Sequence, residues 1–482
     1  MSATSPDLSP TTHTGTHTGT HTGTSFGSSG YRNYVLISLT VLYTLNFVDR
    51  VLIQILAQPI IEEFKLQDWQ FGLLSGFGFA FMYTLMGIPI ARLSERANRV
   101  RIIAAGVILW SVMTALCGLA GSFLALLLFR VGVGVGEAAL TPPANSLIAD
   151  YFIPKSRARA MGTYAMGVTL GGVFAAAFGG PLAELFSWRA AFIALGAPGI
   201  VIGLIFLFTV KEPPRGYSDP PGTKVPEKSS LSDTVAELIP KTSFWLNMAA
   251  AATVAFVGYG YTSFQAAYFQ RAFGMPLTDI ALQVLVPVGL MAAAGAFSTG
   301  VLTERLSSKY PNALAWLPGW GLILCVPAYW LAFTTESVPV AIGGLIVGAY
   351  VHYGYLGAQY TIAQGVASAR SRATAVALLL FVVNMIGYGL GPLFVGFGSD
   401  YFMAQMLDAS SYAGELNTLN CKGAPAELLA SLGAEKSAVC MDASAGGLRR
   451  AILITVTIFA AAGAIYLITC KTLQQDLVAK LS

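Results

Sequence analysis

The sequence has little charge. Lys, Arg, Asp and Glu make up 11% of its 482 residues, against about 25% in an ordinary soluble domain. Hydrophobic residues make up 55%, and the formal net charge is only +4. No basic cluster is interleaved with aromatic residues in a polar segment, so the composition gives no indication of a nucleic-acid partner. These proportions exclude a typical soluble domain and predict a chain whose helices lie in a membrane.

Motifs for several kinds of chemistry are also missing. No lysine directly follows a glycine, so the Gly-x-x-x-x-Gly-Lys-[Ser/Thr] loop that binds nucleotide phosphates is absent. No Cys-x-x-Cys pair or His/Cys ligand spacing indicates a metal site. The polar loops carry no clustered Ser, His and Asp that would indicate an enzyme. We therefore expect no catalytic residues, no bound metal and no cofactor other than a coupling proton.

Cysteine is scarce, and its five positions fall into two groups. Cys117, Cys325 and Cys470 lie in or beside apolar segments, where a buried thiol is usually inert. Cys421 and Cys440 lie in the one long polar segment near the C-terminus. If that segment faces an oxidising compartment, these two could form a disulfide, although a sequence does not supply the sulfur geometry.

The first 33 residues are polar and of low complexity, with Thr-His-Thr-Gly repeats around His13, His17 and His21. Such a composition does not bury a core, so we expect residues 1–33 to form a disordered cytoplasmic tail. We also expect no removable signal peptide, because no basic segment leads into a short apolar run and a cleavage site.

Apolar runs of about 20 residues, the length that crosses a bilayer, follow one another along the rest of the chain. Six precede and six follow the polar segment 211–243, which we interpret as a cytoplasmic linker. We predict an all-α integral membrane protein with twelve transmembrane helices in two pseudo-symmetric six-helix bundles, residues 34–210 and 244–472. Residues 399–449 are predicted to form a long outer loop and residues 473–482 a cytoplasmic tail. The predicted helices are 34–60, 69–91, 101–120, 122–149, 158–183, 187–210, 244–270, 279–303, 312–333, 337–364, 371–398 and 450–470.

Positive charges predict the orientation. Lys and Arg gather in the N-terminal tail, in alternate loops and at the C-terminal end, and they are few in the short intervening loops. Cytoplasmic loops carry an excess of Lys and Arg. We therefore expect a multi-pass protein of the plasma (inner) membrane with both termini in the cytoplasm.

A short motif recurs at the same position in both halves. Leu-x-Glu-Arg follows the second predicted helix at 93–96 and the eighth at 302–305. Recurrence at one topological position is typical of parallel repeats related by an axis along the membrane normal. We expect the charged residues of both copies to form a gate at the cytoplasmic face. They are Glu95, Arg96, Glu304 and Arg305.

Four charged residues interrupt apolar segments, where a charge costs roughly 2.5–3.5 kcal/mol and normally finds a partner or faces a cavity. Asp49 and Arg50 are adjacent in the first predicted helix. Arg130 and Glu137 in the fourth are seven residues apart and therefore nearly on one helical face. A network of these residues suits coupling to protons, because a change of ionic partner changes protonation. The arginines could also hold an anionic substrate group, or the four could serve packing alone.

The second half has no comparable embedded charge, but it is rich in tyrosine. Aromatic and neutral polar side chains suit a ligand with a long apolar part, although each could instead pack against neighbours or lie at a membrane interface. The candidates for a substrate cavity are Tyr259, Gln265, Tyr268, His352, Tyr355, Gln359, Asn384 and Tyr388.

These motifs resemble the major facilitator superfamily over almost all of residues 34–472. The Leu-x-Glu-Arg loops are similar to its signature between the second and third helices, with Ala91 and Asn98 in place of glycines. The closer resemblance is to the Spinster-like transporters. It is carried by Asn-Phe-Val-Asp-Arg at 46–50, by Arg130 with the following Gly-x-Gly-Glu-Ala, and by Ile-Ala-Asp-Tyr-Phe at 148–152.

The resemblance implies transport by alternating access, with Asp49 and Glu137 as proton-linked acids and Arg50 and Arg130 as their partners. Animal members of the Spinster-like family export sphingosine-1-phosphate and lysophospholipids, which implies a lipid-like amphipathic organic anion as substrate. Two alternatives stay open. One is proton symport of a small organic anion such as a sugar acid or carboxylate, and the other is a receptor or scaffold without transport. We expect a monomer surrounded by membrane lipids.

Overall fold

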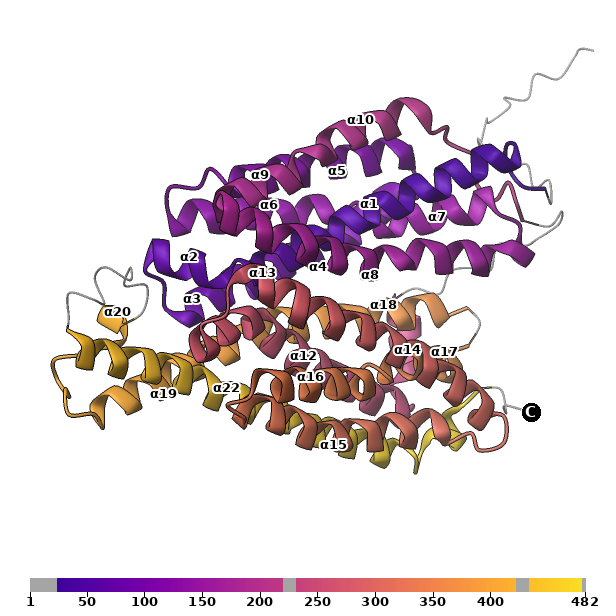
Figure 1. The fold of residues 1–482 in the computed structure, drawn as a ribbon. Coiled ribbons are helices and arrows are strands. Elements are labelled where there is room, and N and C mark those ends of the chain that lie inside the picture. The colour runs from indigo at the N-terminus through magenta and orange to yellow at the C-terminus, as the bar shows by residue number, and fades with distance from the viewer. Residues whose placement is uncertain (1–23, 220–230, 369, 422–432, 479–482) are drawn as a thin grey trace, which may run out of the picture.

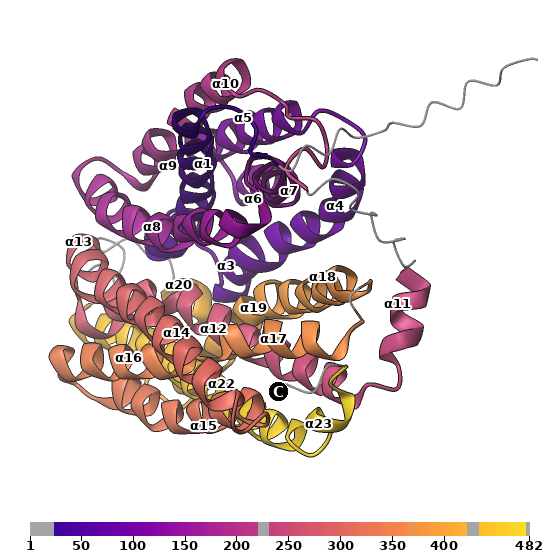
Figure 2. The same cartoon turned by 90° about the vertical axis from the view of Figure 1, so that its right-hand side faces the viewer.

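The computed structural model describes residues 24–219, 231–368, 370–421 and 433–478, and these are almost wholly helical. Figure 1 shows two groups of roughly parallel helices lying side by side, with the first half of the chain in indigo to magenta and the second in red to yellow. Viewed along the helices in Figure 2, each half forms a bundle of its own. The predicted fold class, an all-α membrane protein of two helical bundles, is confirmed.

The first bundle begins with α1 (Ser29–Ile55). This helix starts before the predicted boundary at residue 34 because the Ser28 side chain accepts a hydrogen bond from the backbone N–H of Tyr31, which caps the helix. The other elements of the bundle are α2 (Ala57–Phe64), α3 (Asp68–Gly72), η1 (Leu73–Phe77), α4 (Gly78–Ser94), α5 (Arg99–Cys117), α6 (Phe123–Glu137), α7 (Thr141–Tyr151), α8 (Pro154–Leu185), α9 (Trp188–Gly196) and α10 (Pro198–Thr209).

The short helix α11 (Leu231–Leu238) lies in the linker before the second bundle. The helices of that bundle and of the C-terminal segment are α12 (Thr242–Phe273), α13 (Leu277–Asp279), η2 (Ile280–Leu285), α14 (Val286–Ser307), α15 (Ala313–Thr334), α16 (Val338–His352), α17 (Tyr355–Val366), α18 (Arg372–Val382), η3 (Val383–Leu390), α19 (Gly391–Asp408), α20 (Thr418–Cys421), α22 (Ala434–Thr469) and α23 (Leu473–Asp476). The short α23 is tied to the bundle because Asp476 accepts a hydrogen bond from the backbone N–H of Ser243 at 2.8 Å.

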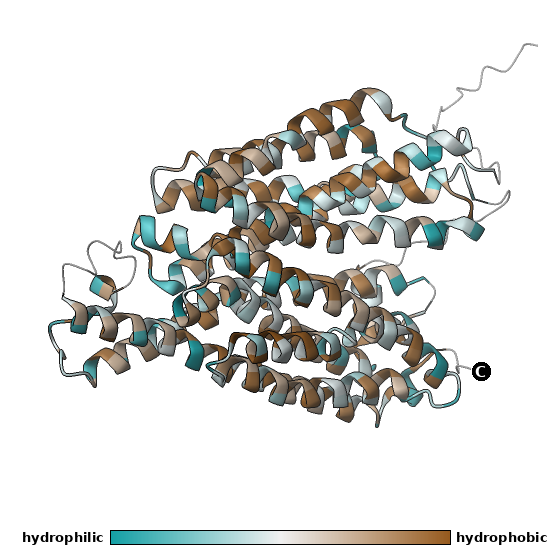
Figure 3. Ribbon diagram, in the orientation of Figure 1, coloured by the Kyte–Doolittle hydropathy of each residue, from teal (hydrophilic) through white to brown (hydrophobic). Residues whose placement is uncertain are grey.

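Within the described residues, eleven helical runs are long and apolar enough to cross a membrane. In Figure 3 most of their length is coloured as hydrophobic, and hydrophilic residues gather toward their ends. The remaining predicted span is α12, which has 32 residues but carries polar side chains such as Asn247 and Gln265. It packs against α17, α19 and α22, so much of its surface is shielded from lipid and tolerates a less apolar sequence.

The segment predicted as an outer loop, residues 399–449, is in fact largely helical. α19 continues to Asp408 and α22 begins at Ala434. Both therefore project beyond the other helices at the end of the bundles opposite to the linker, which we call the outer end (Figure 1). The polar sequence of this segment predicts irregular structure. The described residues of α19, of α22 and between them that extend beyond the other helices, which we call the projection, instead bury a small core of their own. That core contains Met403, Leu407, Leu416, Ala443 and the disulfide-bonded pair Cys421 and Cys440.

The bundles meet along α3 with α19, α4 with η3 and α8 with α14. Glycine permits the closest of these approaches. A side-chain carbon at Gly396 of α19 would lie 2.5 Å from the backbone oxygen of Asp68, at the start of α3. Only a residue without Cβ fits there, so the first half of α19 can lie directly on α3.

Candidate functional site

The four embedded charges predicted from the sequence lie together inside the first bundle. Arg50 Nε is 2.6 Å from Glu137 Oε2, and Arg130 Nη1 donates to the backbone oxygen of Asp49 at 3.4 Å. Asp49, Arg130 and Glu137 are each no more than 2% exposed. The helices α1 and α6 therefore each contribute one acid and one base to a single buried charge cluster.

The cluster is not paired as a closed ring of alternating charges. The carboxylate of Asp49 accepts a hydrogen bond from the Thr114 hydroxyl on α5 at 3.0 Å, rather than from an arginine. Arg130 Nε and Nη2 have no hydrogen-bond partner among the described residues. Leaving donors of a buried guanidinium unsatisfied is costly, so Arg130 is well suited to receive an anionic group from a ligand.

Aromatic rings enclose the cluster. The Arg50 guanidinium carbon lies 4.5 Å from the ring centroid of Tyr83 and 5.1 Å from that of Phe79, within range of cation–π attraction. From the second bundle, Tyr388 of η3 meets Phe79 edge to face at 5.3 Å, and Tyr259 of α12 meets Tyr388 at 4.6 Å. The cluster therefore borders the second bundle through two of the predicted cavity residues.

Other cavity candidates lie deeper in the second bundle. His352 Nδ1 is 3.1 Å from the Tyr329 hydroxyl, which is 2.9 Å from the Tyr261 hydroxyl. The His352 ring stacks on Tyr355 with centroids 5.9 Å apart. These groups form a buried polar chain that is separate from the charge cluster, and Tyr329 is a member that we did not predict.

The remaining candidates differ in their surroundings. Tyr268 donates to the backbone oxygen of Phe333 at 3.0 Å and packs among phenylalanine rings, so it serves packing. Gln265 and Gln359 are buried, and each has one side-chain polar atom without a partner among the described residues. Asn384 is half-buried in η3.

At the end of the bundles that carries the linker, the four residues of the predicted gate are exposed. The buried contacts belong instead to Arg99 at the start of α5. Its guanidinium lies 2.5 Å from Asp150 of α7 and 2.6 Å from Glu212 of the linker, and it also donates to the backbone oxygen of Pro213 at 2.9 Å. Arg99 thus ties α5, α7 and the linker together. The gate residues that we predicted are Glu95, Arg96, Glu304 and Arg305.

A second buried cluster, which the sequence analysis missed, joins the two bundles at their outer end. Arg271 of α12 donates to both carboxylate oxygens of Asp68 in α3, at 2.8 and 2.9 Å. Ser399 donates to the same carboxylate at 2.5 Å. Asp400 of α19 accepts from the backbone N–H groups of Asp68 and Trp69 at the helix start. We call these residues the outer latch, because they join the two bundles at this end.

Residues 39–392 match the family model of the Major Facilitator Superfamily, and the chain belongs to this superfamily of transporters. It is 45% identical to a bacterial homologue of the human lysosomal transporter Spinster, solved in an inward-facing, unoccupied conformation. That match has a TM-score of 0.87 and covers 94% of this chain and 100% of the other. The predicted superfamily and the Spinster-like resemblance are therefore confirmed.

Two curated relatives are more distant. An MFS-type efflux pump of Mycolicibacterium smegmatis is 32% identical over 74% of this chain and 82% of its own length. A hexuronate transporter of Bacillus subtilis is 25% identical over 73% of this chain and 84% of its own length. The relatives thus include proteins named for efflux and for transport of hexuronate.

Proposed function

We propose that this protein is a proton-coupled secondary transporter that moves a lipid-like amphipathic organic anion by alternating access. The observation that carries the proposal is the buried charge cluster, in which Arg130 keeps two free donors beside the acids Asp49 and Glu137. An anion that binds Arg130 adds negative charge next to two carboxyl groups. Proton binding at one of them offsets that charge, so substrate and proton are coupled through the same site.

The pairing within the cluster supports different roles for the two acids. Glu137 is held by Arg50, whereas Asp49 has only a neutral hydroxyl donor from Thr114. A carboxylate without a direct ionic partner in an apolar bundle is the more readily neutralised of the two. We assign Asp49 as the first proton site, and Glu137 as the site that follows when Arg50 changes partner.

The surroundings of the cluster support an amphipathic substrate. Tyr388, Tyr259 and Phe79 provide aromatic surface directly beside the arginines. The polar chain through His352 lies within the second bundle, separate from the charge cluster. Ligand sites of this kind combine apolar walls with a few placed polar groups. A lysophospholipid or a sphingosine-1-phosphate-like molecule presents the matching anionic head and apolar chain.

A second candidate substrate is a small organic anion such as a sugar acid. The relative named as a hexuronate transporter favours it, because an arginine guanidinium binds a carboxylate as well as a phosphate. Both candidates use the same cluster and the same coupling, and they differ in whether the aromatic surface beside Arg130 contacts the substrate.

For its setting, we propose a monomer in the plasma (inner) membrane with both termini in the cytoplasm. The excess of Lys and Arg in alternate loops supports this orientation. The disulfide between Cys421 and Cys440 lies in the projection at the opposite end, as expected of a segment outside the reducing cytoplasm.

The test is uptake into proteoliposomes of labelled lysophospholipid, sphingosine-1-phosphate and hexuronate, with and without an imposed pH gradient. Wild type is compared with Asp49→Asn and with the control Asp442→Asn, which removes an exposed carboxylate from the outer projection. We expect gradient-driven uptake in wild type and in the control, and none in Asp49→Asn. If hexuronate moves and neither lipid does, the small-anion candidate replaces the lipid. Absence of any gradient-driven flux would overturn the proposal.

A further inference from the structure

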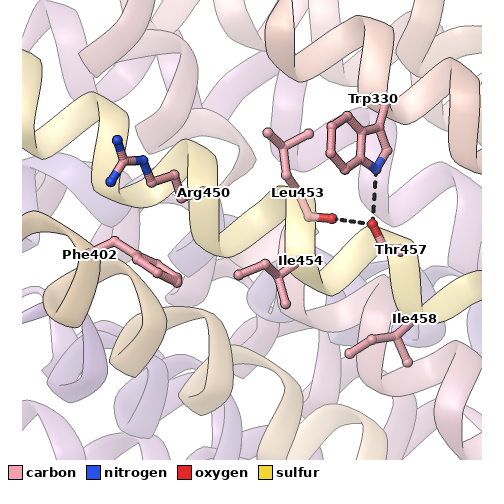
Figure 4. A pocket seen from close by; sticks show the side chains of 7 residues that line it. All are labelled: Trp330, Phe402, Arg450, Leu453, Ile454, Thr457 and Ile458. Atoms are coloured by element: carbon pink, nitrogen blue, oxygen red, sulfur yellow. Dashed lines mark hydrogen bonds between the residues drawn. The ribbon is translucent and has the colours of Figure 1, made fainter.

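A groove lies on the surface of the second bundle, between α15, α19 and α22 (Figure 4). One wall is Trp330 of α15 and the other is Phe402 of α19, and its volume is about 640 Å³. The floor is one face of α22, formed by Arg450, Leu453, Ile454, Thr457 and Ile458. The volume is in the range of sites that bind small molecules, and the groove belongs neither to the charge cluster nor to the bundle interface.

The floor residues follow helical spacing. Positions 450, 453, 454, 457 and 458 fall at intervals of three and four and therefore form one stripe along α22. Trp330 is 44% and Ile454 is 46% exposed, so no part of the described chain covers the stripe. Since α15 and α22 are membrane-crossing helices, this uncovered face lies in the lipid hydrocarbon.

The polar atoms of the groove wall are satisfied internally. Trp330 Nε1 donates to the Thr457 hydroxyl at 2.9 Å, and that hydroxyl donates to the backbone oxygen of Leu453 at 2.7 Å (Figure 4). The middle of the groove is therefore an apolar channel with no free donor to attract water. It suits a hydrocarbon chain.

Charge appears at one end only. Arg450 lies at the outer end of the stripe, where α22 emerges from the small core of the projection, and its side chain is exposed. It forms no ion pair or hydrogen bond within the described part of the chain. From Arg450 to Ile458 the stripe extends about 12 Å along the helix axis, at 1.5 Å per residue. An unpaired cation therefore stands at the outer end of an apolar channel that descends into the membrane.

We propose that this groove binds one anionic phospholipid of the outer leaflet. Its phosphate pairs with Arg450, and an acyl chain lies along α22 between Trp330 and Phe402. Charge complementarity selects the head group, and the apolar stripe holds the chain. The bound lipid lies on the lipid-facing side of the second bundle, so the proposal does not depend on which molecule the protein transports.

The experiment titrates the purified full-length protein in detergent with dioleoylphosphatidylglycerol and, separately, with dioleoylphosphatidylcholine. Bound lipid is counted by native mass spectrometry, and stabilisation is followed by thermal unfolding. The variant Arg450→Gln removes the cation from the groove. Arg449→Gln is the matched control, since Arg449 is the adjacent exposed arginine and does not line the groove. The second variant Ile454→Trp keeps the cation and fills the channel.

We expect phosphatidylglycerol to bind wild type and Arg449→Gln about equally, and to bind Arg450→Gln and Ile454→Trp at least about tenfold more weakly. Unfolding midpoints in detergent without added lipid show whether each variant is folded. Equal loss in Arg449→Gln and Arg450→Gln would mean that the two arginines attract lipid without a site. Equal binding of phosphatidylcholine and phosphatidylglycerol by wild type, or unchanged binding by Ile454→Trp, would also overturn the proposal.

Discussion

Arg50 and Glu137 stabilise the first bundle only as a pair. The Glu137 side chain is fully buried, and its ionic partner Arg50 is 2.6 Å away. Removing one member of a buried pair typically costs about 3–5 kcal/mol because the other charge is left uncompensated, whereas replacing both members is often nearly neutral. The pair therefore predicts a non-additive result in a double-mutant comparison.

The first prediction concerns this pair. Arg50→Met leaves the Glu137 carboxylate without its counter-charge, so we expect a strongly lowered midpoint of thermal unfolding in detergent at neutral pH. Arg50→Met combined with Glu137→Gln removes both charges and should recover most of the loss. If the double variant unfolds as early as the single one, the loss comes from packing of Arg50 against Tyr83 and Phe79 and not from the ion pair.

The sequence predicted site residues where a charged residue lies within an apolar segment. Asp49 and Glu137 stand out because the residues around them are apolar, and the structure brings them into one cluster with the two arginines. Asp68 and Arg271 lie at the ends of apolar runs, where a charge is ordinarily solvated. Their burial depends on contact between bundles that are distant in sequence, and a sequence pattern carries no signal for such a contact.

Among the helices, the polar connections were harder to predict than the membrane spans. Hydropathy located the spans because each one must present apolar side chains to lipid. It gave no sign that α11 would fold in the linker, or that α19 and α22 would continue past the membrane. These segments are stabilised by a few local contacts, such as the disulfide-linked core of the projection, rather than by long apolar stripes.

The linker helix α11 is tied to the loop between α17 and α18 by one carboxylate. Glu237 accepts hydrogen bonds from the backbone N–H of Ser368 at 2.7 Å and from the Ser371 hydroxyl at 2.6 Å. Burial alone raises the pKa of Glu237, but the hydrogen bonds from Ser371 and Ser368 outweigh it and lower the pKa below its ordinary value. The ionised carboxylate is therefore the form that holds the loop.

The second prediction follows from the sign of this shift. Since the pKa of Glu237 is lower in the folded protein than in the unfolded chain, the contact stabilises at pH values above about 4.3, the ordinary glutamate pKa. Its contribution is lost as the pH falls through the folded-state value. Glu237→Gln should therefore increase hydrogen exchange of α11 amides at neutral pH, with a difference from wild type that shrinks in acid.

The control for this prediction is Glu304→Gln, which removes an exposed carboxylate at the C-terminal end of α14. It should leave exchange in α11 unchanged at either pH, once intrinsic exchange rates are corrected for pH. A difference between Glu237→Gln and wild type that persists undiminished in acid would show that ionisation of Glu237 does not hold the loop.

For the whole molecule, the repeated Leu-x-Glu-Arg motif predicted two related bundles, and the structure has them. The direction in which a cavity between them opens could not be predicted, because inward-facing and outward-facing states share one sequence and one set of helices. The outer latch is a contact between the bundles that the sequence did not predict. Its buried contacts join the two bundles at the end that carries the projection.

The last prediction tests whether the outer latch holds the two bundles together at their outer end. Asp68→Asn removes the carboxylate that accepts from both terminal nitrogens of Arg271, so the guanidinium loses its direct ionic partner, which favours any state in which Arg271 reaches water. A bias of about 1.4 kcal/mol changes the ratio of the two states tenfold. Spin labels at the exposed outer positions Leu119 and Glu336 report the separation of the bundles, in a background where Cys117, Cys325 and Cys470 are serine.

In Asp68→Asn we expect a new population with a longer distance between the labels, whereas the control Asp442→Asn keeps the short distance of the parent. Combining Asp68→Asn with Arg271→Gln removes both charges and should return part of the population to the short distance, because no buried charge is then left to hydrate. An unchanged distance distribution in Asp68→Asn would mean that packing of α3 on α19, and not the ion pair, keeps the outer end closed.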